Sequence, residues 1–370
     1  MKKTIALVCA ALTAAAFPFS VYAAAHDLDG NGQLDRNDCA VLTDYLLTNR
    51  RDIASQEADL DADYCLTAKD LTLMKREILR GGQQNPNPQN PEVHVNASEY
   101  MEKVRSSFVL DVPQDILNTK GGELQHITYF STKANKEKGA FVWTPPGYDP
   151  AQQYPVFYVN HGIQGSEYSM LGDFKILESA AGLIQKGEAV PMLIVFTFMY
   201  TNPDRDNCAG ITADEEPFYD AFLGDLTECL MPYIAEHYPV KSGRENTAIG
   251  GFSMGGRESL YIGVSRPDLF GYIAATSPAP GVTPATDQFF EHPGSMPEDK
   301  FRIDPPYEPY LLMIAGGTDD GMVHVAPGNY SKLLTKNGTD HIYVSIQGGG
   351  HDGKTGIPLF YKFIRALFNA

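Results

Sequence analysis

One serine stands between two glycines, each two positions away, in the stretch Gly251-Phe252-Ser253-Met254-Gly255. The stretch follows a short apolar run, Thr-Ala-Ile-Gly-Gly-Phe, and precedes a helix-compatible segment. In the Gly-x-Ser-x-Gly pattern, a sharp strand-to-helix turn exposes the serine hydroxyl, and small neighbours leave room for that turn. A serine that only caps a helix would fit the same letters. The position between a strand and a helix favours a serine nucleophile that attacks a carbonyl.

A serine hydroxyl needs a base to take its proton, and the base needs an acid that orients it. In this kind of fold the three residues follow in the order Ser, Asp, His. The predicted strand that ends at Gly317 is followed by Asp319 and Asp320, and the next predicted strand is followed by His351. We predict Ser253, Asp320 and His351 as the catalytic residues, with Asp319 as the reserve acid. The neighbouring Asp352 is interpreted as structural or solvated.

Two backbone amides are candidates for the oxyanion hole, which stabilises negative charge on the attacked carbonyl oxygen. The first is that of Met254, at the start of the helix that follows Ser253. The second is that of Ile163, in the loop His161-Gly-Ile-Gln-Gly after an earlier predicted strand. For the His161 side chain we predict packing rather than chemistry.

Six short apolar runs rich in β-branched and aromatic residues are typical of buried strands. They occupy residues 154–162, 191–198, 247–252, 272–278, 310–317 and 341–349. Between two of them, apolar residues from Phe218 to Ile234 recur every four positions, as on one face of a helix. Another amphipathic helix closes the chain. Strands alternating with helices predict an α/β domain with a mostly parallel sheet, and sites in such sheets lie at the carboxyl ends of the strands.

The first residues carry two lysines, an apolar run and an ending of small residues, which is the layout of a secretory signal peptide. We predict a signal peptide at 1–24, cleaved near Ala23, rather than a membrane anchor, because Pro18 breaks the apolar run. No other segment approaches the roughly 20 apolar residues of a spanning helix. The chain is therefore expected to be secreted.

Two similar segments begin at Asp27 and Asp59, so residues 25–80 contain a duplication. Residues 81–97 are rich in Gly, Gln, Asn and Pro, as expected of a linker. The remaining residues, 98–370, are long enough for one α/β domain.

Four cysteines follow the leader, and an even number in an exported chain suggests disulfides, which four cysteines can form in three ways. Pairing within each region is the simplest choice; zinc is the alternative, which no Cys-x-x-Cys pair supports. The predicted pairs are Cys39–Cys65 and Cys208–Cys229.

The formal net charge of −17 argues against a nucleic-acid partner, because phosphate binding needs concentrated Lys and Arg. Hydrophobic residues make up 43% of the chain, as in folded globular proteins.

Taken together, the motifs of residues 98–370 resemble a carbohydrate esterase of the feruloyl and acetylxylan esterase type, an esterase-D-like α/β-hydrolase. The matching stretches are TPPGYD, HGIQGSE, GGFSMGGRESL, GGTDDG and IQGGGHDGKTG, in the order and spacing of that family. The family's acid closes a Gly-x-x-Asp turn, which supports Asp320. The resemblance implies an α/β-hydrolase fold and no catalytic cofactor.

The duplicated segment resembles a dockerin, the small helical module that binds a cohesin of a cellulosome scaffold. Dockerin loops resemble EF-hands, in which oxygen ligands at alternating positions surround Ca²⁺. Gly32 stands at the turn position of the first loop, whereas Tyr64 replaces that glycine in the second. The ligands that the resemblance implies are Asp27, Asn31, Asp29, Asp35 and Asp38, then Asp59, Asp61, Asp63 and Asp70.

The resemblance implies a secreted, cellulosome-associated serine esterase that removes feruloyl groups from xylan. Removal of acetyl groups from xylan is the alternative within the same class. An acetyl group needs no aromatic slot, and aromatic residues such as Tyr168 and Tyr200 lie near the site elements. A binding module with a decayed hydrolase site is the alternative from another class.

Overall fold

The computed structural model describes residues 28, 41–43, 74, 97–108, 110–323 and 325–370. The chain divides into two units, Met1–Glu92 and Val93–Ala370. Several predicted features lie outside the described residues: the signal peptide, the linker up to residue 96, the predicted calcium ligands between Asp27 and Asp70, and the predicted Cys39–Cys65 pair.

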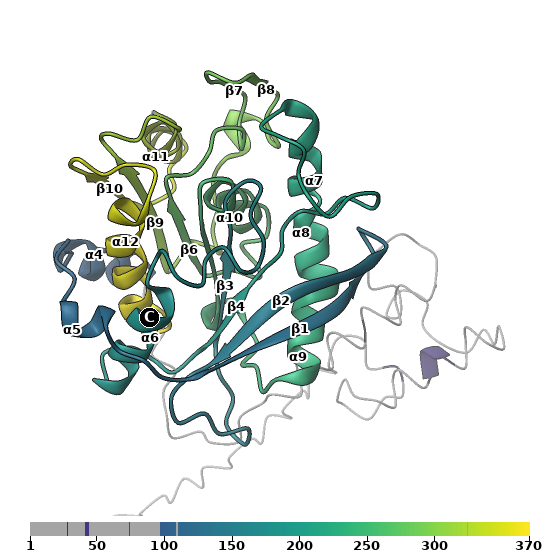
Figure 1. The fold of residues 1–370 in the computed structure, drawn as a ribbon, viewed down its shortest axis with the longest axis vertical. Coiled ribbons are helices and arrows are strands. Elements are labelled where there is room, and N and C mark those ends of the chain that lie inside the picture. Colours follow the sequence, from purple (N-terminus) through teal and green to yellow (C-terminus); the bar gives the residue numbers. More distant parts are fainter. Residues whose placement is uncertain (1–27, 29–40, 44–73, 75–96, 109, 324) are drawn as a thin grey trace, which may run out of the picture. The chain divides into compact units, whose positions relative to one another are not determined.

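An eight-stranded sheet forms the centre of the second unit (Figure 1). Its spatial order is β1-β2-β4-β3-β5-β6-β9-β10. The pairs β1–β2 and β2–β4 are antiparallel, and every other neighbouring pair is parallel. The strands are β1 (Glu123–Ser131), β2 (Lys136–Thr144), β3 (Val156–Asn160), β4 (Leu193–Phe196), β5 (Thr247–Phe252), β6 (Tyr272–Thr276), β9 (Leu311–Gly317) and β10 (Ile342–Ile346). The expected mostly parallel sheet is therefore confirmed, and each of the six predicted runs contains one of its strands.

The antiparallel pair β1–β2 was not predicted from the sequence. The first residues of β1 are exposed, and its later residues alternate between buried and exposed. The strand therefore lacks the continuous apolar run of the central strands. A separate short hairpin pairs β7 (Ala285–Thr286) with β8 (Glu291–His292).

Helices cover both faces of the sheet, because alternate residues of each central strand point to opposite sides. In β5, for example, Ile249 packs into the core on one face and Ala248 into the core on the other. The helices on the Ile249 side include α8 (Phe222–Asp225), α9 (Met231–His237), α10 (Met254–Ser265) and α11 (Ala326–Lys336). Those on the Ala248 side include α4 (Ala97–Ser106), α5 (Gln114–Leu117), α6 (Ile176–Gln185) and α12 (Gly353–Ala366) (Figure 1).

The apolar repeat between Phe218 and Ile234 forms a row of helical pieces instead of one helix. Its core residues Phe222, Leu226, Leu230 and Ile234 are fully buried, as the repeat of four predicts. The pieces are α7 (Glu216–Asp220), α8, the π-helix η2 (Leu226–Leu230) and α9. Single-turn 3₁₀ helices are η1 (Ala213–Glu215), η3 (Arg244–Asn246) and η4 (Glu298–Lys300).

The predicted Cys208–Cys229 disulfide is wrong, because both residues are free cysteines in the structure. The Cys208 thiol lies 3.1 Å from the carbonyl oxygen of Gly210, within its own loop. The Cys229 sulfur lies on η2 and contacts Thr132 Oγ1 at 3.3 Å. Although Cys208 and Cys229 are near each other in the sequence, their sulfur atoms contact different segments of the chain.

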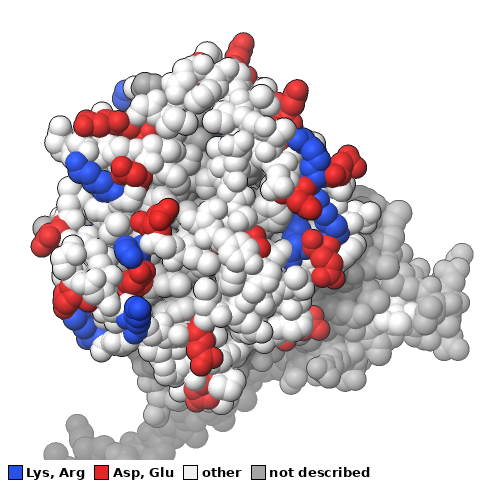
Figure 2. Space-filling model, in the orientation of Figure 1, with Lys and Arg blue, Asp and Glu red and all other residues white. Residues whose placement is uncertain are grey.

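The described surface mixes charges of both signs. On the face seen in Figure 2, basic and acidic side chains lie beside one another. Ion pairs between opposite charges include Lys133–Glu228 and Lys136–Asp206. Among the described residues, no helix combines the length and apolar character that crossing a bilayer demands.

One ion pair in the core ties β2 to α8. Lys138 Nζ lies 2.6 Å from Asp225 Oδ2, and neither side chain has any exposed surface. Thr201 accepts another hydrogen bond from Lys138, and the Tyr129 hydroxyl donates to the same Asp225 oxygen. Breaking such a pair leaves a buried charge without a partner.

Lys138→Met is expected to lower the free energy of unfolding by about 3–5 kcal/mol, because Asp225 would stay buried without its counter-charge. Lys136→Met is the matched control on the same strand: its partner Asp206 is 77% exposed, and exposed pairs contribute about 1 kcal/mol or less. Urea unfolding followed by tryptophan fluorescence measures both. Equal losses in the two variants would contradict the prediction.

Candidate active site

Ser253 occupies a strained turn between β5 and α10. Its φ of 57° and ψ of −120° lie in a region that residues with a side chain rarely adopt. The Ser253 amide donates to the carbonyl of Thr276 on β6 at 3.0 Å, which holds the turn against the sheet. A Cβ on Gly251 would lie 2.5 Å from the carbonyl oxygen of Gly255, so the chain passes here only with glycine. The turn therefore explains the small residues around the serine.

Three predicted residues form one chain of hydrogen bonds. His351 Nε2 lies 3.0 Å from Ser253 Oγ, and His351 Nδ1 lies 2.9 Å from Asp320 Oδ2. The other Asp320 oxygen accepts from the amides of Met322 and Val323, so the carboxylate is fixed. These residues come from the ends of β5, β9 and β10, as the position of sites in parallel sheets predicts.

Asp320 is buried yet set up to stay ionised. Burial works against its charge, but the hydrogen bond and charge of His351 and the Val323 amide hold the pKa of Asp320 below its usual value. An ionised acid at Nδ1 keeps that nitrogen protonated and leaves Nε2 as the acceptor facing Ser253.

The other two acidic candidates face elsewhere. Asp319 is exposed, and its Oδ1 accepts from Thr318. The Asp352 side chain accepts from the Lys354 amide at 2.9 Å and so caps the start of α12. The structure thus brings Asp320, and neither of these, to His351.

The amides predicted for the oxyanion hole have no hydrogen-bond acceptor among the described residues. Met254 is the first residue of α10, and Ile163 follows β3; both line the cavity at Ser253. His161 beside them is fully buried and bonded through both ring nitrogens, to Met199 and Gly162. Burial lowers the pKa of His161 to about 4, so this ring is neutral and braces the loop.

A narrow apolar slot opens at Ser253. Its volume is about 40 Å³, and its walls include Ile211, Met254, Phe289, Phe290 and Met322. Phe289 and Met322 are 42% and 39% exposed, so they stand at the rim. Tyr200 is buried with its hydroxyl on Glu215, and Tyr168 is exposed and stacked on His126; neither lines the slot.

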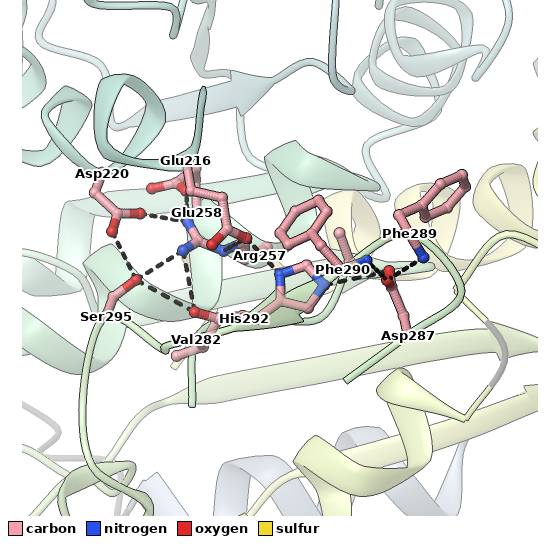
Figure 3. A network of polar contacts seen from close by, with 12 residues as sticks. Glu216, Asp220, Arg257, Glu258, Val282, Asp287, Phe289, Phe290, His292 and Ser295 are labelled. Carbon is pink, nitrogen blue, oxygen red and sulfur yellow. Dashed lines mark hydrogen bonds and ion pairs between the residues drawn. The ribbon is translucent and has the colours of Figure 1, made fainter. Parts of the chain in front are cut away.

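The hairpin β7–β8, which carries Phe289 and Phe290, is held by a buried charge network (Figure 3). His292 on β8 lies between two carboxylates, with Nδ1 2.6 Å from Glu216 and Nε2 3.2 Å from Asp287. Glu216 belongs to α7, so the ion pair between His292 and Glu216 joins the hairpin to the row of helical pieces that begins with α7.

Arg257, four residues after Ser253 on α10, is the positive centre of this network (Figure 3). It forms ion pairs with Asp220 and Glu258 and donates to Ser295 Oγ and the carbonyl of Gly281. Sequence reasoning missed its role, although the motif Gly-Gly-Arg-Glu-Ser-Leu was in view. The available signal was the charged pair Arg257-Glu258 within a predicted buried helix, because charged residues are rarely buried unless they are paired.

His292→Gln is expected to destabilise the protein most at low pH. Burial alone would lower the pKa of His292, but the hydrogen bonds and charges of Glu216 and Asp287 outweigh it and raise that pKa. A histidine whose pKa is raised in the folded state stabilises that state. The stabilisation is fully present below the ordinary histidine pKa of about 6.5, and it is lost as the pH rises through the pKa of the folded state.

The urea midpoint of wild type and His292→Gln, measured between about pH 5.5 and 9, should therefore converge as pH rises. His237→Gln is the control, because His237 is exposed on α9. A difference in urea midpoint between wild type and His292→Gln that stays constant with pH would contradict the interpretation that His292 is positively charged in the folded protein.

Comparison with known proteins adds to this geometry. Residues 131–341 match the family described as "Putative esterase", and residues 25–79 match the dockerin type I domain. A solved CE1 ferulic acid esterase from Anaeromyces mucronatus, in complex with ferulic acid, is 37% identical with a TM-score of 0.68; the match covers 71% of this chain and 98% of that one.

Two curated relatives match over shorter stretches. An endo-1,4-beta-xylanase/feruloyl esterase of Xylanibacter ruminicola is 31% identical over 156 residues, 41% of this chain and 21% of the relative. Endo-1,4-beta-xylanase Y of Acetivibrio thermocellus is 28% identical over 202 residues, 51% of this chain and 16% of the relative. The matched region is thus about a fifth or less of either relative. Since the esterase match spans more than half of its 370 residues, the chain belongs to the esterase family and carries a dockerin type I domain.

Proposed function

We propose that this chain is a serine esterase that removes feruloyl or related hydroxycinnamoyl groups from xylan. The observation that carries the proposal is the hydrogen-bonded row Ser253–His351–Asp320 at the mouth of an apolar slot. The relative solved with ferulic acid and the curated relative named as a feruloyl esterase support this choice of acyl group.

In the proposed mechanism, Ser253 Oγ attacks the ester carbonyl carbon while His351 Nε2 takes the hydroxyl proton. The amides of Ile163 and Met254 donate to the oxyanion, and the positive end of α10 favours its charge. Collapse of this intermediate breaks the bond to the alcohol, which leaves with the proton from His351. Water, activated by the same imidazole, then releases the acid from Ser253.

Deacetylation of xylan is the second candidate, and one observation favours it. The slot at Ser253 has a volume of only about 40 Å³, and a small cavity suits an acetyl group better than a hydroxycinnamoyl ring. A decayed binding module is disfavoured by the intact hydrogen-bonded row.

Initial rates on methyl ferulate and on acetylated xylan separate the two activities. We expect clear turnover of methyl ferulate and little release of acetate. Ser253→Ala should reduce the ferulate rate by about 10⁴-fold or more without unfolding, because the nucleophile is lost while the slot remains. A serine-directed phosphonate should label wild type and not the variant. Retained activity in Ser253→Ala would rule out this mechanism, and preferred release of acetate would reassign the acyl group.

For the amino-terminal part, we propose a signal peptide at 1–24, a dockerin module at 25–80, a linker at 81–97 and the esterase domain from 98. The alternating Asp and Asn oxygens of the first loop fit Ca²⁺, a hard cation that takes oxygen ligands. The second loop offers Asp oxygens at matching positions, but Tyr64 stands where the turn glycine is needed. The dockerin match supports a cohesin partner and a secreted, cellulosome-associated protein. A calcium clip without a docking role is the alternative.

Capture of the full chain on immobilised scaffoldin cohesin, with Ca²⁺ or with EGTA, tests the docking role. We expect capture with Ca²⁺ and loss of at least about tenfold in EGTA, because the loops would lose their shared ligand. Asp27→Ala with Asp59→Ala should mimic the chelator, and rates on methyl ferulate should stay unchanged. Chelator-dependent folding without any cohesin capture would favour the clip.

A further inference from the structure

A cavity of about 420 Å³ lies between α4 and the carboxyl-terminal end of α12. The two helices lie side by side (Figure 1), and the Tyr100 hydroxyl of α4 donates to the carbonyl oxygen of Ala366 at the end of α12. Helix α12 starts just after His351, and its 14 residues rise about 1.5 Å each, so the cavity lies roughly 20 Å along this helix from the proposed catalytic histidine. It is therefore separate from the active site.

The wall of this cavity is basic, although the chain as a whole has a formal net charge of −17. The described residues that line it include Lys103, Lys362 and Arg365 and no acidic residue. Val104 and Phe108 add apolar surface. Sites for small organic molecules have volumes of about 300–1,000 Å³ and combine apolar walls with a few polar groups, as this cavity does.

Lys362 is the least expected member of this wall, because only 7% of its surface is exposed. Among the described residues, its ammonium group has no hydrogen-bond or ion-pair partner, and its printed contact is with the Tyr361 ring, whose centroid lies 5.1 Å from Nζ. Burial lowers the pKa of Lys362, and the charge of Arg365 lowers it further. Buried charges are normally paired, so Lys362 lacks the anion that would compensate it.

The other two basic groups differ in how far they are already neutralised. Arg365 Nη2 lies 3.0 Å from Glu188 Oε2, so its charge has a partner. Lys103 is exposed on α4 and has no ion-pair partner among the described residues. Two uncompensated ammonium groups, one from each helix, thus line the same cavity.

We propose that this cavity binds a small organic anion, a carboxylate carried on a ring, with Lys103 and Lys362 as the donors and Phe108 as part of the surface on which the ring packs. An ammonium group offers three donors and suits a carboxylate, and the volume and the apolar wall require a ligand with a body larger than an inorganic anion. Sugar acids and aromatic acids share this chemistry. The site is independent of the proposed esterase function.

Calorimetric titration of the full chain with glucuronate and with benzoate tests the site and distinguishes the two kinds of ring. We expect saturable binding of at least one of these acids. Glucose, which keeps the sugar ring without the carboxylate, should not bind. Lys362→Met should weaken binding about tenfold or more, because the charge is lost while the apolar stem remains. Lys103→Met should act in the same direction. Benzoate bound in the slot at Ser253 would not respond to either substitution.

The urea midpoint separates a ligand-binding lysine from a structural one. Lys362→Met should unfold at the wild-type midpoint or above it, because an unpaired buried charge is removed. A lower midpoint with unchanged binding would assign Lys362 a structural role and overturn the proposal.

Lys332→Met is the matched control, because Lys332 is exposed on α11, carries the same charge and does not line this cavity. Its affinity for the acid should equal that of wild type. Three results would overturn the site: no saturable binding of either acid, equal weakening in Lys332→Met, or inorganic phosphate bound as tightly as the acids. Rates on methyl ferulate should stay within about twofold in Lys362→Met, because distant sites act independently.

Discussion

The site depends on one backbone constraint, the positive-φ conformation of Ser253 between β5 and α10. That conformation is costly for a residue with a side chain, and the surrounding contacts over-determine it. The Ser253 amide is bonded to β6, and its carbonyl accepts from Arg257 and Ala279. The constraint lifts the hydroxyl out of the sheet and places the first amide of α10 beside it. His351 and Asp320 are useful only because the serine is presented to them in this way.

The slot wall formed by the β7–β8 hairpin is held by ion pairs between buried side chains. Arg257 extends from the same helix that starts after Ser253. Its carboxylate partners are Glu216 and Asp220 on α7 and Glu258 on α10 itself. One of these partners, Glu216, also holds His292 of the hairpin. Buried charges of this kind are stable only as a complete set. The position of the slot wall is therefore linked, through a few side chains, to the helix that carries the proposed nucleophile.

Much of this arrangement could be read from the sequence, because local signals determined it. The central strands are continuous apolar runs, and the turn glycines beside Ser253 allow a close approach that other residues would block. The order Ser, Asp, His then limited the partners to few candidates. What the sequence could not supply depends on distant contacts. The β1–β2 pair has a mixed pattern, the Arg257 network joins separate segments, and the expected Cys208–Cys229 bond failed because the two sulfurs face different loops.

The hairpin that carries Phe289 and Phe290 lies outside the eight-stranded sheet. Its residues contribute to the shape of the slot without supporting the strands that position Ser253, Asp320 and His351. A substitution at Phe289 or Phe290 therefore alters the slot, while the strand ends that carry Ser253, Asp320 and His351 lie in the separate eight-stranded sheet. The hairpin is also tied to α7 through His292 and Glu216, so a change at its tip is separable from the rest of the fold only while that ion pair is kept.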